Sequence, residues 1–241
     1  MVTTNLPNGV TNVLDTTVFG TFGAPDPSKY IEFFDDFMAY RVDAATTPVA
    51  YGDWLVTTTG SGTGVVTDEN GGVVLVTNGA SDDDNYFAQW QGGNAANVAE
   101  TFKFIAKKQT WFKCRFKVSD ATQSDIVIGL QITDTTPLAV TDGVYFLKAD
   151  GSTTMNLLVT KNSTSTTTAA ATIADATYIT LGFVYNGSDR IDIYADDVRV
   201  ASSVTTNLVD DEELAVSFGL QNGEAAAKTM NLDYIFVASE R

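Results

Sequence analysis

The 241-residue sequence predicts an all-β fold, a sandwich of two antiparallel sheets, and three observations support that prediction. Thr and Val are abundant beside 14 Phe and 9 Tyr, and β-branched and aromatic side chains fit the pleated surface of a sheet. Short apolar runs alternate with turn dipeptides such as Asp150-Gly151 and Asn186-Gly187, which accept positive φ and close hairpins. The hydrophobic fraction of 44% is enough to fill a core between two sheets.

Individual strands are predicted from the alternation of their side chains. Residues 111–118 give the clearest strand, because apolar and polar positions alternate along it, so that one face is buried and the other is wet. The apolar face holds Phe112, Cys114, Phe116 and Val118. Residues 178–185, 190–194 and 198–204 are predicted to form an antiparallel meander. The Thr- and Ala-rich residues 163–171 are predicted to be an exposed edge strand or a loop, because Thr disfavours a helix.

The chain divides into an extended N-terminal arm, residues 1–29, and a sandwich domain, residues 30–241. Three prolines in the arm disfavour a regular ladder, while its spaced apolar residues would be costly to leave in water. These apolar residues are therefore candidate contacts to a partner subunit: Leu6, Val10, Val13, Leu14, Val18, Phe19 and Phe22. The alternative is a loose terminus, or one that folds onto its own domain.

The charge distribution excludes some partners and indicates another. A net charge of −16 repels phosphates, so no nucleic-acid partner is expected. No run approaches the ~18 apolar residues of a membrane span, so no membrane partner is expected. Residues 1–9 have neither a basic nor an apolar signal region, so no secretion signal is expected, unless a processed chain has lost it. Six of the 14 basic residues nevertheless fall between positions 103 and 117, and Lys113, Arg115 and Lys117 share the polar face of one predicted strand. That face is a candidate contact to an acidic partner, or simply a solvated surface.

The residue types argue against catalysis. The sequence has no histidine, which excludes Ser-His-Asp and Cys-His arrangements and His-based zinc sites. Glu32, Asp35 and Asp36 are the nearest approach to a paired-carboxylate motif, but their spacing does not place two acids side by side on one strand face. The acidic run of residues 82–85 lacks the alternating ligand spacing of a calcium loop, and lone Cys114 lies on an apolar face. We therefore predict no catalytic residue, metal or cofactor, and no enzyme activity.

Several segments from residue 30 onward resemble the concanavalin A-like jelly roll found in lectins, laminin G-type domains and virion proteins. They are Phe33-Phe34-Asp35-Asp36-Phe37, residues 111–118, Ile126-Val127-Ile128-Gly129-Leu130, Asp142-Gly143-Val144-Tyr145-Phe146, residues 191–197, Val216-Ser217-Phe218-Gly219-Leu220 and the closing residues 232–237. The resemblance implies a two-sheet antiparallel jelly-roll β-sandwich whose last strand lies beside its first.

Residues 5–10 and 238–241 are also similar to segments of auxiliary structural proteins of bacteriophage capsids. That resemblance implies a non-enzymatic capsid decoration or cement protein on the capsid exterior, assembled in the host cytoplasm. Its partner would be the major capsid protein, bound through the N-terminal arm, and it would form a homo-oligomer such as a trimer.

An alternative function is a carbohydrate-binding adhesin or tail-fibre domain, with host glycans as ligands. Trp54, Tyr86, Trp90 and Trp111 are then the candidate sugar contacts, unless they belong to the core.

Overall fold

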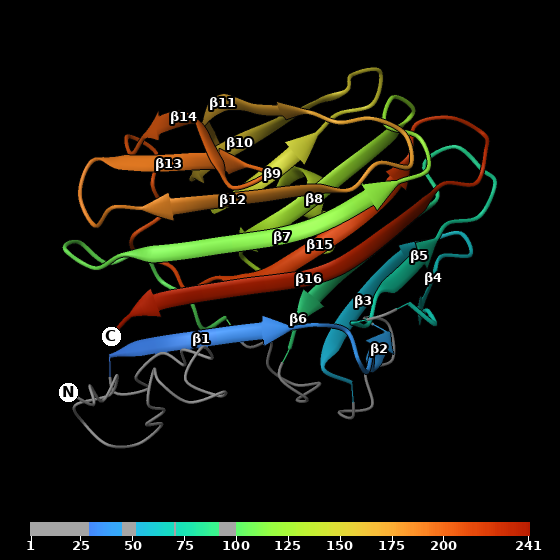
Figure 1. The fold of residues 1–241 in the computed structure, drawn as a ribbon, viewed down its shortest axis with the longest axis horizontal. Coiled ribbons are helices and arrows are strands. Elements are labelled where there is room, and N and C mark those ends of the chain that lie inside the picture. The colour runs from blue at the N-terminus through green and yellow to red at the C-terminus, as the bar shows by residue number, and fades with distance from the viewer. Residues whose placement is uncertain (1–28, 45–51, 70, 92–99) are drawn as a thin grey trace, which may run out of the picture.

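Two packed sheets account for nearly all of the regular structure in the computed structural model, which describes residues 29–44, 52–69, 71–91 and 100–241 (Figure 1). The front sheet of Figure 1 has the order β14-β13-β12-β7-β16-β5-β4, with β1 also paired to β16. Its strands are β1 (Tyr30–Asp35), β4 (Thr63–Val66), β5 (Val74–Thr77), β7 (Thr110–Val118), β12 (Ile179–Tyr185), β13 (Arg190–Ala195), β14 (Val198–Val204) and β16 (Thr229–Glu240).

The back sheet has the order β11-β10-β9-β8-β15-β6-β3-β2. Its strands are β2 (Val42–Ala44), β3 (Trp54–Thr59), β6 (Asn85–Trp90), β8 (Ser124–Gln131), β9 (Gly143–Lys148), β10 (Thr154–Lys161), β11 (Thr164–Thr172) and β15 (Ala215–Asn222). A short 3-10 helix, η1 (Pro137–Ala139), is the one helical element among the described residues. No helix in this part of the chain has the length and apolar character needed to cross a bilayer.

The predicted sandwich is confirmed, with one difference in strand direction. β2 runs parallel to β3, with Val42 opposite Trp54, whereas the sequence predicted antiparallel pairing throughout. The prediction relied on hairpin dipeptides, and those signals reveal only neighbours joined by a tight turn. Parallel strands need a longer connection, so local turn chemistry carries no sign of this pair.

The predicted strand at residues 111–118 is confirmed as β7, whose residues alternate between buried and half-buried positions along all nine residues. Its inward ring Phe112 stacks on Phe183 of β12, with 5.1 Å between ring centroids and 10° between planes. Cys114 is fully buried, as expected of a small hydrophobe. The meander prediction is confirmed by β12, β13 and β14, and β11 is an edge strand as predicted.

The first and last strands lie side by side in the front sheet (Figure 1). Tyr30 is opposite Glu240 and Phe34 is opposite Phe236, so β1 forms the edge of the sheet next to the C-terminal half of β16. Residues 1–28 lie outside the described residues, so the predicted arm remains a prediction. Its junction, Lys29, adjoins this edge.

Candidate ligand groove on the outer face of the front sheet

Strand register places four residues in one row across the outer face of the front sheet. Phe236 of β16 is opposite Lys113 of β7, Lys113 is opposite Gly182 of β12, and Gly182 is opposite Tyr194 of β13. Directly paired residues point to the same side of a sheet, so the side chains of Phe236, Lys113 and Tyr194 all face outward. The row therefore carries two aromatic rings and one ammonium group, with a gap at the glycine.

A second row lies one step along the strands. Ala238 of β16 is opposite Trp111 of β7, which is opposite Val184 of β12. The Trp111 indole is half-buried and meets the ring of Tyr30 edge-on, with 6.0 Å between centroids. Together the two rows give an aromatic and aliphatic surface of a kind that sheets usually turn toward a core rather than toward solvent.

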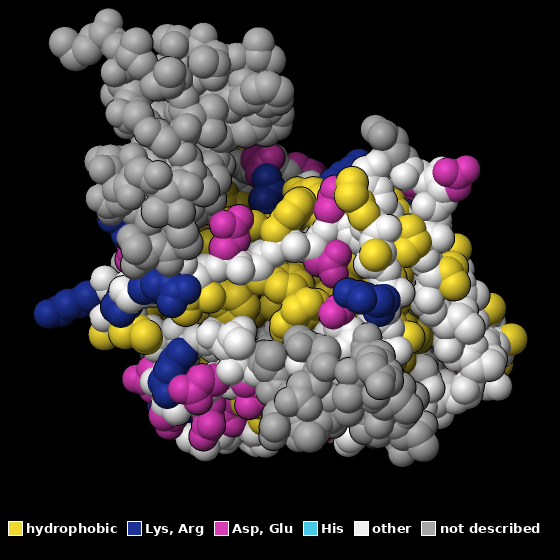
Figure 2. All heavy atoms as spheres, turned by 90° about the horizontal axis from the view of Figure 1, so that it is seen from below, with side chains coloured by type: hydrophobic (Ala, Val, Ile, Leu, Met, Phe, Trp, Pro, Cys, Tyr) yellow, Lys and Arg dark blue, Asp and Glu magenta, His cyan; other side chains and the backbone are white. Residues whose placement is uncertain are grey.

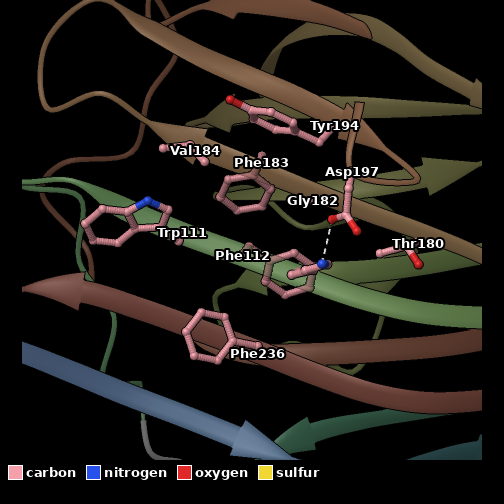
Figure 3. Close-up of a pocket in the computed structure, with 10 residues that line it drawn as sticks. Trp111, Phe112, Thr180, Gly182, Phe183, Val184, Tyr194, Asp197 and Phe236 are labelled. Carbon is pink, nitrogen blue, oxygen red and sulfur yellow. Dashed lines mark ion pairs between the residues drawn. The ribbon is translucent and has the colours of Figure 1, made fainter. Parts of the chain in front are cut away.

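Gly182 makes this surface concave. A Cβ at this position would lie 2.8 Å from the backbone oxygen of Phe112, so the close approach of β12 and β7 favours glycine here. The missing side chain leaves a hollow of about 270 Å³ over the strands, with Phe112 and Phe183 beneath it. Figure 3 shows Phe236 and Tyr194 on opposite sides of β7 and β12, with Trp111 toward one end. We call this hollow and its walls the aromatic groove.

An ion pair closes the other end of the groove. The Lys113 Nζ lies 2.5 Å from Oδ1 of Asp197, and the dashed line in Figure 3 marks this contact. Asp196 and Asp197 both have positive φ, and they turn the β13–β14 hairpin back so that Asp196 Oδ1 accepts the Thr180 N–H. The hydrogen bond to Asp197 raises the pKa of Lys113, although burial acts to lower it. The groove thus ends in a pair of opposite charges, the Lys113 ammonium and the Asp197 carboxylate, which cancel each other.

Beyond the ion pair, the outer face carries two more cations, Arg115 and Lys117, and both contact other side chains. Arg115 pairs with Asp233, and its guanidinium lies 4.0 Å above the centroid of the Tyr178 ring. Lys117 Nζ lies 4.5 Å from the same ring centroid. The β16 register shifts between Leu232 and Tyr234, and bulges of this kind re-aim a side chain, here that of Asp233. Burial, with a further contribution from Glu69, raises the pKa of Tyr178 to about 12.

The predicted partner-contact residues fall into two groups. The apolar residues of the arm lie outside the described residues: Leu6, Val10, Val13, Leu14, Val18, Phe19 and Phe22. Lys113, Arg115 and Lys117 share the outer face of β7, as the alternation predicted. Two of the three already bind carboxylates, so this face does not present three open cations to an acidic partner.

The four aromatic candidates for sugar contact differ in position, because three pack in the interior and one lies on the outer face. Trp54 and Tyr86 are 1% and 2% exposed and lie between the sheets. Trp90 packs against Phe33, with 4.7 Å between ring centroids. Only Trp111 of the four lies on the outer face, where it lines the groove.

The acidic candidates are used in turns and in packing. Asp35 ends β1, where its carboxylate accepts the Phe37 N–H at 2.8 Å and the Trp54 Nε1–H at 3.0 Å. In the acidic run 82–85, Asp84 is buried and accepts the Ser81 N–H, while Asp83 accepts a hydrogen bond from Gln221. Within the described ranges no three His, Cys, Asp or Glu side chains gather in a group that could hold a metal ion.

Four residues on which the groove depends were not among the sequence candidates: Gly182, Tyr194, Asp197 and Phe236. A usable signal existed, because Phe236 alternates with the buried Ile235 and Val237 and therefore occupies a position that polar residues normally fill. Trp111 breaks the same rule on β7. Aromatic residues at outward positions of neighbouring strands would have indicated the groove, had the order of strands been known.

Hydrophobic side chains also reach the edge of this sheet. Figure 2 looks at the sandwich from below, where β1 lies in Figure 1, and shows hydrophobic side chains gathered between acidic and basic ones. Phe34 on β1 is 57% exposed and pairs in register with Phe236, so the apolar surface extends from the groove to the edge strand.

No protein-family model matches the sequence, and no curated protein matches it either. Solved structures do match the fold. A protein of unknown function, SO2946 from Shewanella oneidensis MR-1, has a TM-score of 0.59 and 15% identity, covering 92% of this chain and 91% of that chain. SCLam, a non-specific endo-β-1,3(4)-glucanase from family GH16, has a TM-score of 0.56 and 14% identity, covering 90% and 94%. The carbohydrate recognition domain of Emp46p has a TM-score of 0.53 and 11% identity, covering 77% and 88%.

The chain has the concanavalin A-like jelly-roll fold. The fold predicted from the sequence is thereby confirmed. At these identities the likeness establishes the fold alone. Neither these structures nor the sequence comparisons link the chain to bacteriophage virion proteins.

Proposed function

We propose that this protein is a non-catalytic carbohydrate-binding protein and that the aromatic groove is its glycan site. The observation that carries the proposal is the outward placement of Trp111, Phe236 and Tyr194 around a hollow floored by Gly182. Aromatic side chains combine a large apolar face with defined geometry, and pyranose rings offer them matching C–H faces. Lys113 and Asp197 would supply hydrogen bonds to hydroxyl groups at the polar end.

The fold neighbours are consistent with this proposal, because one is named a carbohydrate recognition domain and another a glucanase. Their identities of 11% and 14% carry no residue-level argument, so the proposal rests on the groove itself.

The carboxylates named on this face are paired with cations, which supports glycan binding rather than glycoside hydrolysis. Glycoside hydrolysis needs two carboxyl groups about 5–9.5 Å apart, one of them protonated and free to act as an acid. Among the described residues, Asp197 is the one carboxylate that lines the groove, and it is bound to Lys113. On the same face, Asp233 pairs with Arg115, and Asp192 pairs with two arginines.

Replacing Trp111 with alanine tests the proposal. We expect the affinity for a bound glycan to fall about tenfold, equivalent to about 1.4 kcal/mol, because the ring supplies apolar contact that water replaces poorly. Binding would first be found on a glycan array and then measured by titration calorimetry. Met38→Ala is the control for the loss of a surface apolar side chain, since Met38 is 78% exposed and lies outside the groove lining. Unchanged affinity in a folded Trp111→Ala protein would assign the glycan to another surface.

The capsid-decoration hypothesis is a separate proposal, supported by the sequence of residues 1–29 and by the resemblance of residues 5–10 and 238–241. A docked arm removing about 400 Å² of apolar surface from water would contribute on the order of 10 kcal/mol before ordering costs. Deleting residues 1–28 should then abolish co-sedimentation with the capsids it decorates, while glycan binding at the groove persists because β1 begins at Tyr30. Undiminished co-sedimentation of the shortened protein would count against the arm.

A further inference from the structure

We infer that the aromatic groove selects an uncharged glycan with equatorial hydroxyls, laid across the strands, and discriminates against the corresponding acidic glycan. This inference rests on the proposed carbohydrate-binding function and adds the chemical class of the ligand. Its basis is the charge state of the residues on and around the groove.

The shape of the groove favours an extended oligosaccharide. The row from Phe236 to Tyr194 crosses β16, β7, β12 and β13, which are three inter-strand spacings, or about 14 Å in all. Figure 3 shows the two rings on opposite sides of the central pair of strands. Pyranoses with equatorial hydroxyls present flat C–H faces, so successive rings of such an oligomer can rest on Phe236, Trp111 and Tyr194 without a deep pocket.

Lys113 in the groove and Arg115 beside it on β7 are each paired with one carboxylate. Lys113 lies 2.5 Å from Asp197, and Arg115 is bound to Asp233. A glycan carboxylate or sulfate at either cation would therefore have to displace a protein carboxylate from its partner, and the displaced group would stay nearby as a like charge. Farther along the sheet, Arg190 and Arg199 share the single carboxylate of Asp192, so one positive charge remains there, outside the residues that line the groove.

Carboxylates also dominate the wider surface. Glu32 on β1 is exposed and lies opposite Ala238, in the same row as Trp111. The whole chain carries a net charge of −16, which slows and weakens the association of polyanions at low ionic strength. A neutral glycan meets none of these penalties and keeps the stacking contacts.

The discrimination should depend on the Lys113–Asp197 pair. Replacing Asp197 with asparagine keeps a residue that tolerates the positive φ of 65° at this position, but it frees the Lys113 ammonium to bind an anion. We therefore expect Asp197→Asn to raise the affinity for an acidic glycan about tenfold while changing the affinity for the neutral glycan much less.

A matched pair of ligands makes the test sharp: a β-1,4-linked glucose hexamer and the corresponding glucuronic acid hexamer, which differ only in the carboxylate at C6. Calorimetry with the full chain should detect the neutral oligomer and at least tenfold weaker binding of the acidic one. Asp68→Asn is the control variant, because it removes the same charge at an exposed position between β4 and β5.

Each outcome is decisive. Equal or tighter binding of the acidic oligomer by the wild-type protein overturns the charge inference while leaving the carbohydrate-binding proposal intact. Failure of both oligomers, together with a silent array of neutral β-linked glycans, overturns the inference and the proposed function together. An equal gain for Asp68→Asn and Asp197→Asn would assign the discrimination to net charge and exclude the ion pair.

Discussion

Replacing Trp54 with alanine is expected to lower the free energy of unfolding by about 3–5 kcal/mol, while the folded fraction still binds glycan at the groove. The side chain is 1% exposed and lies among aromatic rings between the sheets. Its ring centroid lies 5.0 Å from that of Phe218 and 5.6 Å from that of Trp90. The truncation leaves a cavity and also removes the Nε1–H that Asp35 accepts, so packing and hydrogen bonding are lost together.

Urea unfolding followed by circular dichroism measures this loss, and calorimetry below the transition measures binding. Trp54→Phe is the graded control, because it keeps a six-membered aromatic ring in the core while removing the bond to Asp35. We expect it to cost clearly less than the alanine variant. A Trp54→Ala protein that is as stable as wild type but has lost glycan binding would move the sugar contact from Trp111 to Trp54 and contradict the aromatic groove as the glycan site.

Replacing Lys148 with methionine is expected to destabilise the fold by a similar amount, about 3–5 kcal/mol, because three buried acceptors lose their donor. Lys148 ends β9 and is fully buried, and its Nζ donates to the backbone oxygens of Ala121, Thr122 and Ser152 at 2.9, 3.1 and 3.1 Å. Burial lowers the pKa of Lys148, and the nearby carboxylates of Asp125 and Asp150 oppose that shift. Methionine fits the space but leaves three carbonyl groups without their donor.

Lys161→Met is the matched control for this prediction. Lys161 pairs at the surface with Asp210 and Asp211, so its loss should be a small fraction of the loss at Lys148. Urea unfolding of both variants under the same conditions makes the comparison. Equal losses would show that the three carbonyl groups find other partners, such as water, when the ammonium is removed.

The alternation of side chains and the turn residues were sufficient to predict much of the fold. The alternation at residues 111–118 predicted β7 and the buried position of Cys114, and the Asn186-Gly187 turn predicted the β12–β13 hairpin. These features depend on side-chain period and turn chemistry, which act between residues close in sequence. The parallel β2–β3 pair was missed because its partners are joined by no tight turn.

The groove depends on neighbours that are far apart in the chain. Trp111, Val184 and Phe236 were visible as residues, but only the order β16-β7-β12-β13 makes them neighbours. Lys148 shows the same limit, because a lysine at a strand end has the sequence signature of a solvated residue and is instead enclosed by backbone oxygens.

Residue patterns alone were therefore enough to predict the all-β class, the two-sheet sandwich and the faces of the main strands, and to exclude histidine chemistry. The three-dimensional arrangement was needed to show which aromatic residues face solvent, which cations are paired with carboxylates and where a ligand could lie. Secondary structure follows from short-range periodicity, whereas a binding surface follows from the lateral order and register of strands that are distant in sequence.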